Sequence, residues 1–372
     1  MTYQISPWVR EQYPAGFFDQ LFALEEGLGA EIVNRILMEK GGHISIIGNS
    51  RSGKTEKKKW MQLQLVRIGE TLIEFDTGKP GDIECYFDNP NPAARFNKPV
   101  TVLIPMEGPC KFEVTGVPEN IPVTIIRVPA PEMYWDLIRP GEINIISLRN
   151  YFQDTKALKR YMRRMLAGFA LRARLGHFHK WTPAILSIDE AHEAAGSQSV
   201  DRQQESILLT MDLSNMERQL ASSKIRMMLT TQSLYDLPEA VRKNTHIFIV
   251  NRGAWAEKRD NKDLHYLQGF ADRAYPWQGW MVIHGRRFYS QMPIPFQLVG
   301  IPENIRINYM PEGGCFADSP LDEEKDEVIS DFRADPKCDR MMQMWMKAGP
   351  VESEPVDVIT SRYDVPAGID EL

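Results

Sequence analysis

The feature that most constrains the fold of this chain is the segment GNSRSGKT at residues 48–55. It follows a short apolar stretch and precedes a helix-forming one, so glycines stand at both ends of a loop between a strand and a helix. Glycine lets such a loop turn its backbone N–H groups inward, where they and the helix N-terminus bind phosphate oxygens. The pattern GxxxxGK[ST] therefore predicts an α/β fold with a phosphate-binding loop.

Short apolar runs alternate with helical stretches along the chain. The expected strands are at residues 43–48, 71–76, 144–148, 184–189, 227–231 and 246–250, and the expected helices are at 25–38, 155–175 and 203–222. Strands that alternate with helices of this length predict a mostly parallel sheet with helices on both faces. The fold class is therefore α/β.

Two regions depart from the alternation. Residues 77–141 are rich in Pro, Gly and Asn, and we expect an insertion with some β structure of its own, at 100–104 and 123–128. Residues 279–289 predict a C-terminal hairpin around Gly285. The expected division is an N-terminal helical segment at 1–42, a core at 43–300 that contains the insertion, and an acidic, partly disordered tail at 301–372.

Charge is unevenly distributed in this chain of 372 residues, whose net charge is −6. Residues 312–372 hold 16 acidic and 6 basic residues, a net of −10, so residues 1–311 carry +4. The overall acidity therefore does not argue against a nucleic-acid partner for the body of the protein. Within the tail, the Met- and Trp-containing stretch at 338–347 is a candidate docking helix for a protein partner.

Composition excludes several classes of protein. The chain is 43% hydrophobic and 25% charged, which is typical of a globular protein and not of a collagen-like or disordered one. No apolar run is long enough to span a bilayer. The four cysteines stand far apart, which favours a reducing compartment. We therefore expect a cytoplasmic protein.

Two further motifs supply groups for phosphate chemistry. The run AILSIDEAH at 184–192 places Asp189 at the carboxyl end of a strand, where it can hold Mg²⁺. Glu190 follows and is expected to polarise the attacking water as a general base. The run MMLTTQS at 227–233 ends in Gln232, which is expected to face the γ-phosphate from the neighbouring strand.

These motifs predict a nucleoside triphosphate site with Mg²⁺. Lys54 is expected to contact the β- and γ-phosphates, and the Thr55 hydroxyl is expected to bind the metal together with Asp189. The basic residues around the loop are expected to serve nucleotide or inter-subunit contacts. They are Arg51, Lys57, Lys58 and Lys59. The expected nucleotide-binding residues are Gly48, Asn49, Ser50, Arg51, Ser52, Gly53, Lys54 and Thr55.

The order of these motifs over residues 30–300 resembles the HerA/FtsK superfamily of RecA-like P-loop motors. The resemblance rests on segments 48–55 (Walker A), 143–148, 185–192 (Walker B), 229–233 and 236–244 and on the closing hairpin. It implies a RecA-like P-loop NTPase fold, ATP and Mg²⁺ as cofactors, a homohexameric ring, and Gln232 as a polar sensor. It also implies an ATPase that translocates or packages double-stranded DNA. By analogy with the packaging and conjugation motors of this group, the expected setting is the cytoplasm of a cell that hosts a virus or plasmid.

One departure from the family concerns the arginine that reaches the neighbouring subunit's nucleotide. Members usually carry it eleven residues before the sensor glutamine, where this chain has Ala221. The candidates to replace it are Arg218, Arg226, Arg242 and Arg252.

The helix expected at 155–175 has a basic face opposite an apolar stripe. The candidate DNA contacts on that face are Lys156, Arg160, Arg163 and Arg164, and a solvated surface or a subunit interface explains them equally well. Two alternative functions also stay open: a P-loop nucleotide switch that binds a protein partner through the tail, and a protein-translocating ATPase that acts without DNA.

Overall fold

The computed structural model describes residues 42–67, 69–76, 83–88, 98–106, 110–148, 155–180, 183–189, 224–237, 239–256, 261–273, 279–283, 288–292 and 304–311, together with Leu209, Asp212, Leu220 and Lys258. The helices predicted at 25–38 and 338–347, and nearly all of that at 203–222, lie outside these residues. None of the described helices combines the length and the apolar character that crossing a membrane requires.

The described residues form a ten-stranded sheet with the order β11-β10-β9-β1-β8-β7-β2-β6-β3-β5. Its strands from β9 to β5 are parallel, and β10 and β11 add an antiparallel hairpin at one edge. The strands are β1 (His43–Ile47), β2 (Thr71–Asp76), β3 (Val100–Pro105), β5 (Val123–Val128), β6 (Ile143–Ser147), β7 (Ala184–Ile188), β8 (Ile225–Thr231), β9 (Thr245–Asn251), β10 (Gly279–Ile283) and β11 (Phe288–Met292).

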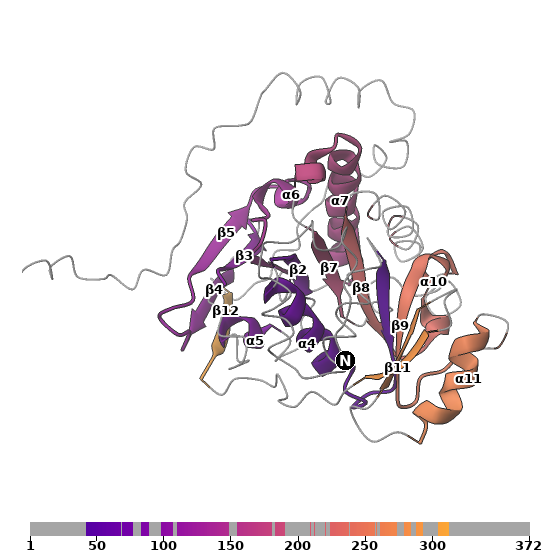
Figure 1. Ribbon diagram of the computed structural model, residues 1–372. Coiled ribbons are helices and arrows are strands. Elements are labelled where there is room, and N and C mark those ends of the chain that lie inside the picture. Colours follow the sequence, from indigo (N-terminus) through magenta and orange to yellow (C-terminus); the bar gives the residue numbers. More distant parts are fainter. Residues whose placement is uncertain are drawn as a thin grey trace, which may run out of the picture.

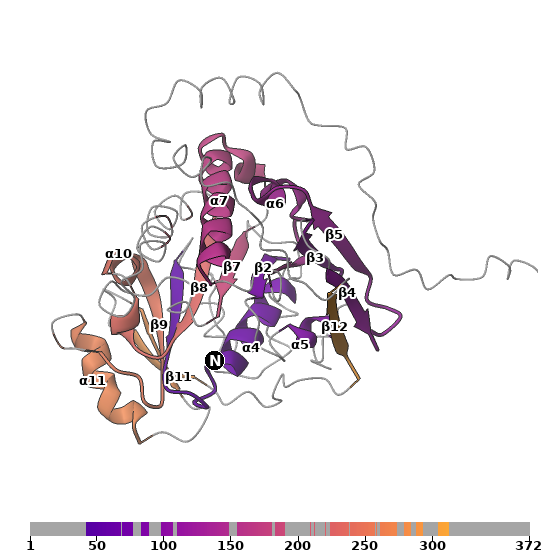
Figure 2. The same ribbon diagram turned by 180° about the vertical axis from the view of Figure 1, so that it is seen from behind.

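Helices cover both faces of this sheet (Figures 1 and 2). One face packs against α4 (Lys54–Arg67) and α5 (Glu84–Asp88), and the small sheet of β4 (Cys110–Thr115) and β12 (Arg306–Pro311) lies on the same side. The other face packs against α7 (Thr155–Arg174) and shorter elements, namely η2 (Pro131–Met133), α6 (Tyr134–Leu137), η3 (His177–Lys180), η5 (Leu234–Asp236), α10 (Glu239–Asn244) and α11 (Lys262–Ala271).

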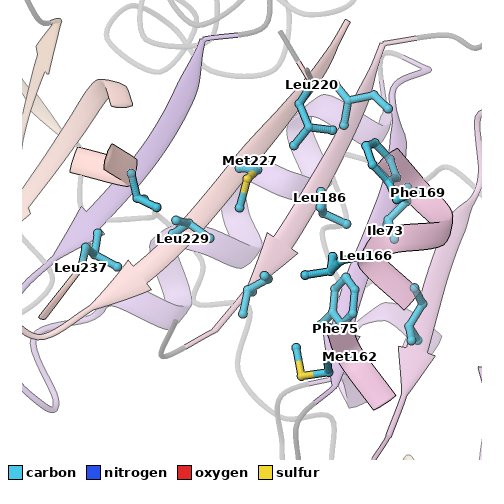
Figure 3. Close-up of a cluster of buried hydrophobic side chains, with 14 of the residues drawn as sticks. Ile73, Phe75, Met162, Leu166, Phe169, Leu186, Leu220, Met227, Leu229 and Leu237 are labelled. Atoms are coloured by element: carbon cyan, nitrogen blue, oxygen red, sulfur yellow. The ribbon is translucent and has the colours of Figure 1, made fainter. Parts of the chain in front are cut away.

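The strands are apolar on both sides because both sides are covered. In β2, Leu72 belongs to the cluster under α4, whereas Ile73 and Phe75 belong to the cluster under α7. Figure 3 shows Ile73 and Phe75 beside Met162, Leu166 and Phe169 of α7. Each side chain buried in this way contributes roughly 1.5–3 kcal/mol. Because successive side chains of a strand point to opposite faces of the sheet, alternate residues pack against the helices on one face or the other.

The structure confirms the predicted α/β fold with a mostly parallel sheet, flanking helices and a closing hairpin. All six predicted strands are present. The β structure predicted at 100–104 and 123–128 is also present, but β3 and β5 extend the main sheet and do not form a unit of their own. The physical reason is that β6 pairs with β2 on one side and offers its other edge to β3.

Candidate functional site

The loop at residues 48–53 is fixed between the ends of the two strands that flank β1. The Gly48 N–H donates to the Thr231 carbonyl of β8 at 3.2 Å, and the Asn49 N–H donates to the Arg252 carbonyl at 3.0 Å, just after β9. Within the loop, the Ser52 N–H donates to the Asn49 carbonyl at 3.2 Å. The start of the loop is therefore held by β8 and β9 at the carboxyl edge of the sheet, where ligands bind in open α/β folds.

The two glycines of the loop are required for different reasons. Gly53 has a φ of 88°, which is accessible to glycine and strained for other residues. Gly48 is required by a close approach, since a Cβ there would lie 2.7 Å from the Asn251 Cβ and 2.7 Å from the Ser52 Oγ. Between them, Arg51 adopts a φ of 63° with an exposed side chain. The pattern of glycines thus follows from backbone geometry.

Lys54 begins α4 and points back over the loop. Its ammonium donates to the Gly48 carbonyl at 2.8 Å and to the Asn49 carbonyl at 3.2 Å, and the residue is 5% exposed. A phosphate oxygen is a charged acceptor and bonds an ammonium more strongly than a neutral carbonyl does. The arrangement therefore suits a ligand with phosphates, and Thr55, half-buried on the first turn of α4, adds a hydroxyl beside it.

Asp189 follows β7 at the same edge of the sheet. Its Oδ1 accepts a hydrogen bond from the Thr230 hydroxyl of β8 at 2.5 Å, and the residue is 5% exposed. Because β8 lies between β1 and β7, this carboxylate and the phosphate loop are separated by one strand. A carboxylate and a hydroxyl are the oxygen ligands that Mg²⁺ prefers, so Asp189 and Thr55 fit that ion.

A buried polar chain, which sequence reasoning missed, continues inward from Asp189. The Lys58 ammonium lies 3.5 Å from Asp189 Oδ1 and 2.7 Å from Glu74 Oε1 of β2. Gln62 donates to the other Glu74 oxygen at 2.7 Å, and the Tyr86 hydroxyl donates to Gln62 at 2.6 Å. Only the spacing of Lys54 and Lys58, one helical turn apart, gave a signal for this chain.

Of the two roles expected for the three lysines after the loop, the structure contradicts the contact with a neighbouring subunit. Lys57, Lys58 and Lys59 are 1%, 0% and 2% exposed, so they face the interior and not a neighbouring subunit. Burial lowers the pKa of Lys57 to about 7 because the charged form loses its hydration. The reason is that α4 is buried on nearly all sides beyond its first turn.

Gln232 is exposed directly after β8, between the strand of the phosphate loop and that of Asp189. The pairing of β7 with β8 confirms that the strand leading to Gln232 is the neighbour of the strand leading to Asp189. Its role as a sensor stays a prediction. Glu190, the expected general base, lies outside the described residues.

The structure excludes one of the four candidate arginines. Arg226 is 4% exposed and bonds Glu70 at 2.8 Å, near the amino end of β8 and away from the phosphate edge. Arg226 is the second residue of β8, so it lies at the opposite end of the strand from Thr231, which contacts the phosphate loop. Arg252 is exposed beside the loop, and Arg242 is half-buried on α10. Arg218 lies outside the described residues.

Several basic side chains of α7 form ion pairs with acidic residues of the same chain. Arg163 bonds Asp212 at 3.1 Å, and Arg164 bonds Glu132 at 2.8 Å. Arg172 likewise bonds Asp136. Arg160 is half-buried, and the side chain of Lys156 lies outside the described part of the helix. The acidic partners reduce the charge that this face offers to DNA.

A scan against protein-family models and a search of curated proteins found no match. Among solved structures, the genome packaging NTPase B204 from Sulfolobus turreted icosahedral virus 2, in complex with ATP-gammaS, is 12% identical with a TM-score of 0.40. The match covers 69% of this chain and 98% of that one.

Two further solved structures are similar at the same level. VirB4 of Thermoanaerobacter pseudethanolicus is 11% identical with a TM-score of 0.42, over 66% of this chain and 88% of that one. The pCW3 conjugation coupling protein TcpA is 12% identical with a TM-score of 0.36, over 68% of this chain and 60% of that one. Likeness at this level carries no inference about activity, and the fold assigned above rests on this chain's own strand order.

Proposed function

We propose that this protein is an ATP-hydrolysing motor that translocates or packages double-stranded DNA as a homo-oligomeric ring. The observation that carries the ATPase part is the arrangement at one sheet edge. The loop at 48–53 presents Lys54, and Asp189 lies one strand beyond β8, bonded to Thr230. A phosphate-binding loop and a metal-binding carboxylate at this separation suit phosphoryl chemistry.

The residues of this chain have distinct tasks in the proposed reaction. Lys54 and the loop amides neutralise the charge that develops on the phosphates, and Thr55 and Asp189 hold Mg²⁺. A Mg²⁺ ion held by these two residues would supply Lewis-acid stabilisation of the charge on the phosphates. Glu190 takes a proton from the attacking water, and Gln232 responds to the γ-phosphate. The DNA substrate, the ring and its hexameric size rest on the family resemblance of the sequence.

The test is steady-state ATP hydrolysis with and without linear duplex DNA. We expect DNA to stimulate the hydrolysis rate of the wild-type protein. We expect Glu190→Gln to abolish hydrolysis both with and without DNA. Lys54→Ala is expected to lower the rate by roughly 100-fold or more, since it removes a charge that stabilises the transition state. Lys243→Met is the matched control, because Lys243 is an exposed lysine paired with Glu239 on α10. Unchanged hydrolysis in Lys54→Ala overturns the proposal.

The ion pairs on α7 support a second candidate function, in which the protein acts without DNA as a nucleotide switch or a protein-translocating ATPase. They neutralise Arg163 and Arg164, two of the four candidate DNA contacts. The same assay separates the two functions. Hydrolysis that requires Glu190 but does not change with DNA supports the alternative, and stimulation by DNA supports the motor.

A further inference from the structure

Helix α4 carries two lysines with different tasks at the same site. Lys54 stands on its first turn and reaches the loop, and Lys58 stands one turn later on the same side. Lys58 is fully buried, with its ammonium between Glu74 of β2 and Asp189 after β7. The helix that presents the phosphate-binding lysine is therefore also attached to the metal-site carboxylate.

The distances show how the attachment is built. Glu74 accepts from Lys58 at 2.7 Å and from Gln62 at 2.7 Å, so each of its carboxylate oxygens has a donor from α4. Asp189 Oδ1 lies 3.5 Å from the Lys58 ammonium and 2.5 Å from the Thr230 hydroxyl. A hydrogen bond from Thr230 and an ion pair with Lys58 thus meet at the same oxygen of Asp189, which restricts the rotation of its side chain.

The net charge of Glu74, Asp189 and Lys58 is compatible with a bound metal ion. Glu74 and Asp189 together carry −2 and Lys58 carries +1, so the group has a net charge of −1. A buried site with an excess of negative charge attracts a cation. Partners behind a metal-binding carboxylate commonly set its orientation and the affinity of the site.

We propose that Lys58 is a positioning residue, which bridges Glu74 and Asp189 and thereby holds the Mg²⁺-binding carboxylate in a fixed relation to the phosphate loop. This inference rests on the proposed function, because it assigns Lys58 a part in the same nucleotide site. Lys58 does not touch the nucleotide and acts through Asp189.

The decisive variant is the double substitution Lys58→Met, Glu74→Gln. Lys58→Met alone leaves Glu74 buried without its cation and is expected to unfold more easily, whereas the double variant removes both charges. The double variant also keeps the net charge at −1, because Asp189 remains. An effect of Lys58 through net charge alone is therefore absent from the double variant, and an effect through the position of Asp189 is retained.

The measurement is the affinity for a fluorescent ATP analogue across a titration of Mg²⁺, and again in EDTA. In the double variant we expect the half-saturating Mg²⁺ concentration to rise roughly 10-fold or more, with unchanged affinity in EDTA. Lys59→Met is the matched control, since it removes a buried lysine from the next position of the same helix, and it is expected to keep the wild-type Mg²⁺ requirement.

A wild-type Mg²⁺ requirement in the double variant overturns the inference. An equal loss of affinity with and without Mg²⁺ also overturns it, because that result indicates general damage to the fold. Failure of the proposed function looks different, since the wild-type protein itself then shows no nucleotide binding.

Discussion

Three consecutive lysines of α4 face three different environments. Lys58 lies between two carboxylates, and Lys57 packs near the β10 end of the sheet, with its Cε 3.4 Å from where a Cβ would stand on Gly279. Lys59 contributes to the electrostatic surroundings of Cys85, whose pKa is raised to about 12 chiefly by burial. Identical residue types therefore differ in their surroundings and partners because successive positions on a helix point about 100° apart.

Lys57 gives a prediction about pH. Its pKa is lowered by burial from 10.5 to about 7, so above pH 7 the folded protein binds fewer protons at this site than the unfolded chain. Stability then rises with pH between about 7 and 10.5, by at most about 1.4 kcal/mol per pH unit, and the penalty of burial is fully present below pH 7.

The measurement is the free energy of unfolding of wild type and Lys57→Met by chemical denaturation at several pH values. We expect the advantage of Lys57→Met to be largest at and below pH 7 and to shrink toward pH 10. The comparison with the variant removes the contributions of other groups that titrate in this range. A difference that stays constant over the range contradicts the shifted pKa.

At the scale of elements, the packing around a glycine in a helix decides whether its replacement lowers or raises the stability of the protein. Gly168 faces η2, and a Cβ there would lie 2.8 Å from the Glu132 Cα and 2.9 Å from the Glu132 carbonyl oxygen. Arg164 bonds the side chain of the same Glu132. Gly269 of α11, in contrast, has nothing within 4 Å of the added Cβ. The two glycines therefore have opposite consequences when replaced.

We expect Gly168→Ala to destabilise the protein by roughly 1–3 kcal/mol, because the methyl group forces α7 and η2 apart. Gly269→Ala is its matched control and is expected to stabilise by roughly 0.5–1 kcal/mol, since alanine has the better helix propensity. Chemical denaturation of both variants measures the difference. Equal effects of the two substitutions refute the close approach of α7 to η2.

At the scale of the whole molecule, charge separates the body from the tail. Residues 312–372 carry −10 and the rest of the chain +4. A polyanion such as DNA is attracted to the body and repelled by the tail, over a distance that salt shortens. The tail is therefore expected to weaken the binding of DNA to this protein.

Removal of residues 312–372 tests this expectation. We expect the shortened protein to bind duplex DNA more tightly than the full chain at low salt, with a difference that diminishes as salt is raised. Fluorescence anisotropy of labelled DNA measures both proteins over a salt series. Equal affinities at low salt show that the tail does not act through its charge.

The sequence by itself determined the six neighbouring strands from β9 to β6, the phosphate loop and the strand that ends just before Asp189. These are local signals: glycine spacing, apolar runs of strand length and a carboxylate directly after such a run. The order of motifs also placed Gln232 at the end of the strand next to that of Asp189, and the pairing of β7 with β8 confirms that the two strands are neighbours.

Only the tertiary structure decided the partners of the charged residues. Lys58, Glu74 and Asp189 are far apart in the chain and meet because α4, β2 and β7 pack together. Arg226 proved to be an internal partner of Glu70. β3 and β5 proved to extend the main sheet beyond β6, with β5 at its edge. The physical reason is that a charged residue or an apolar run specifies what kind of neighbour it needs, whereas the packing of distant segments specifies which neighbour it meets.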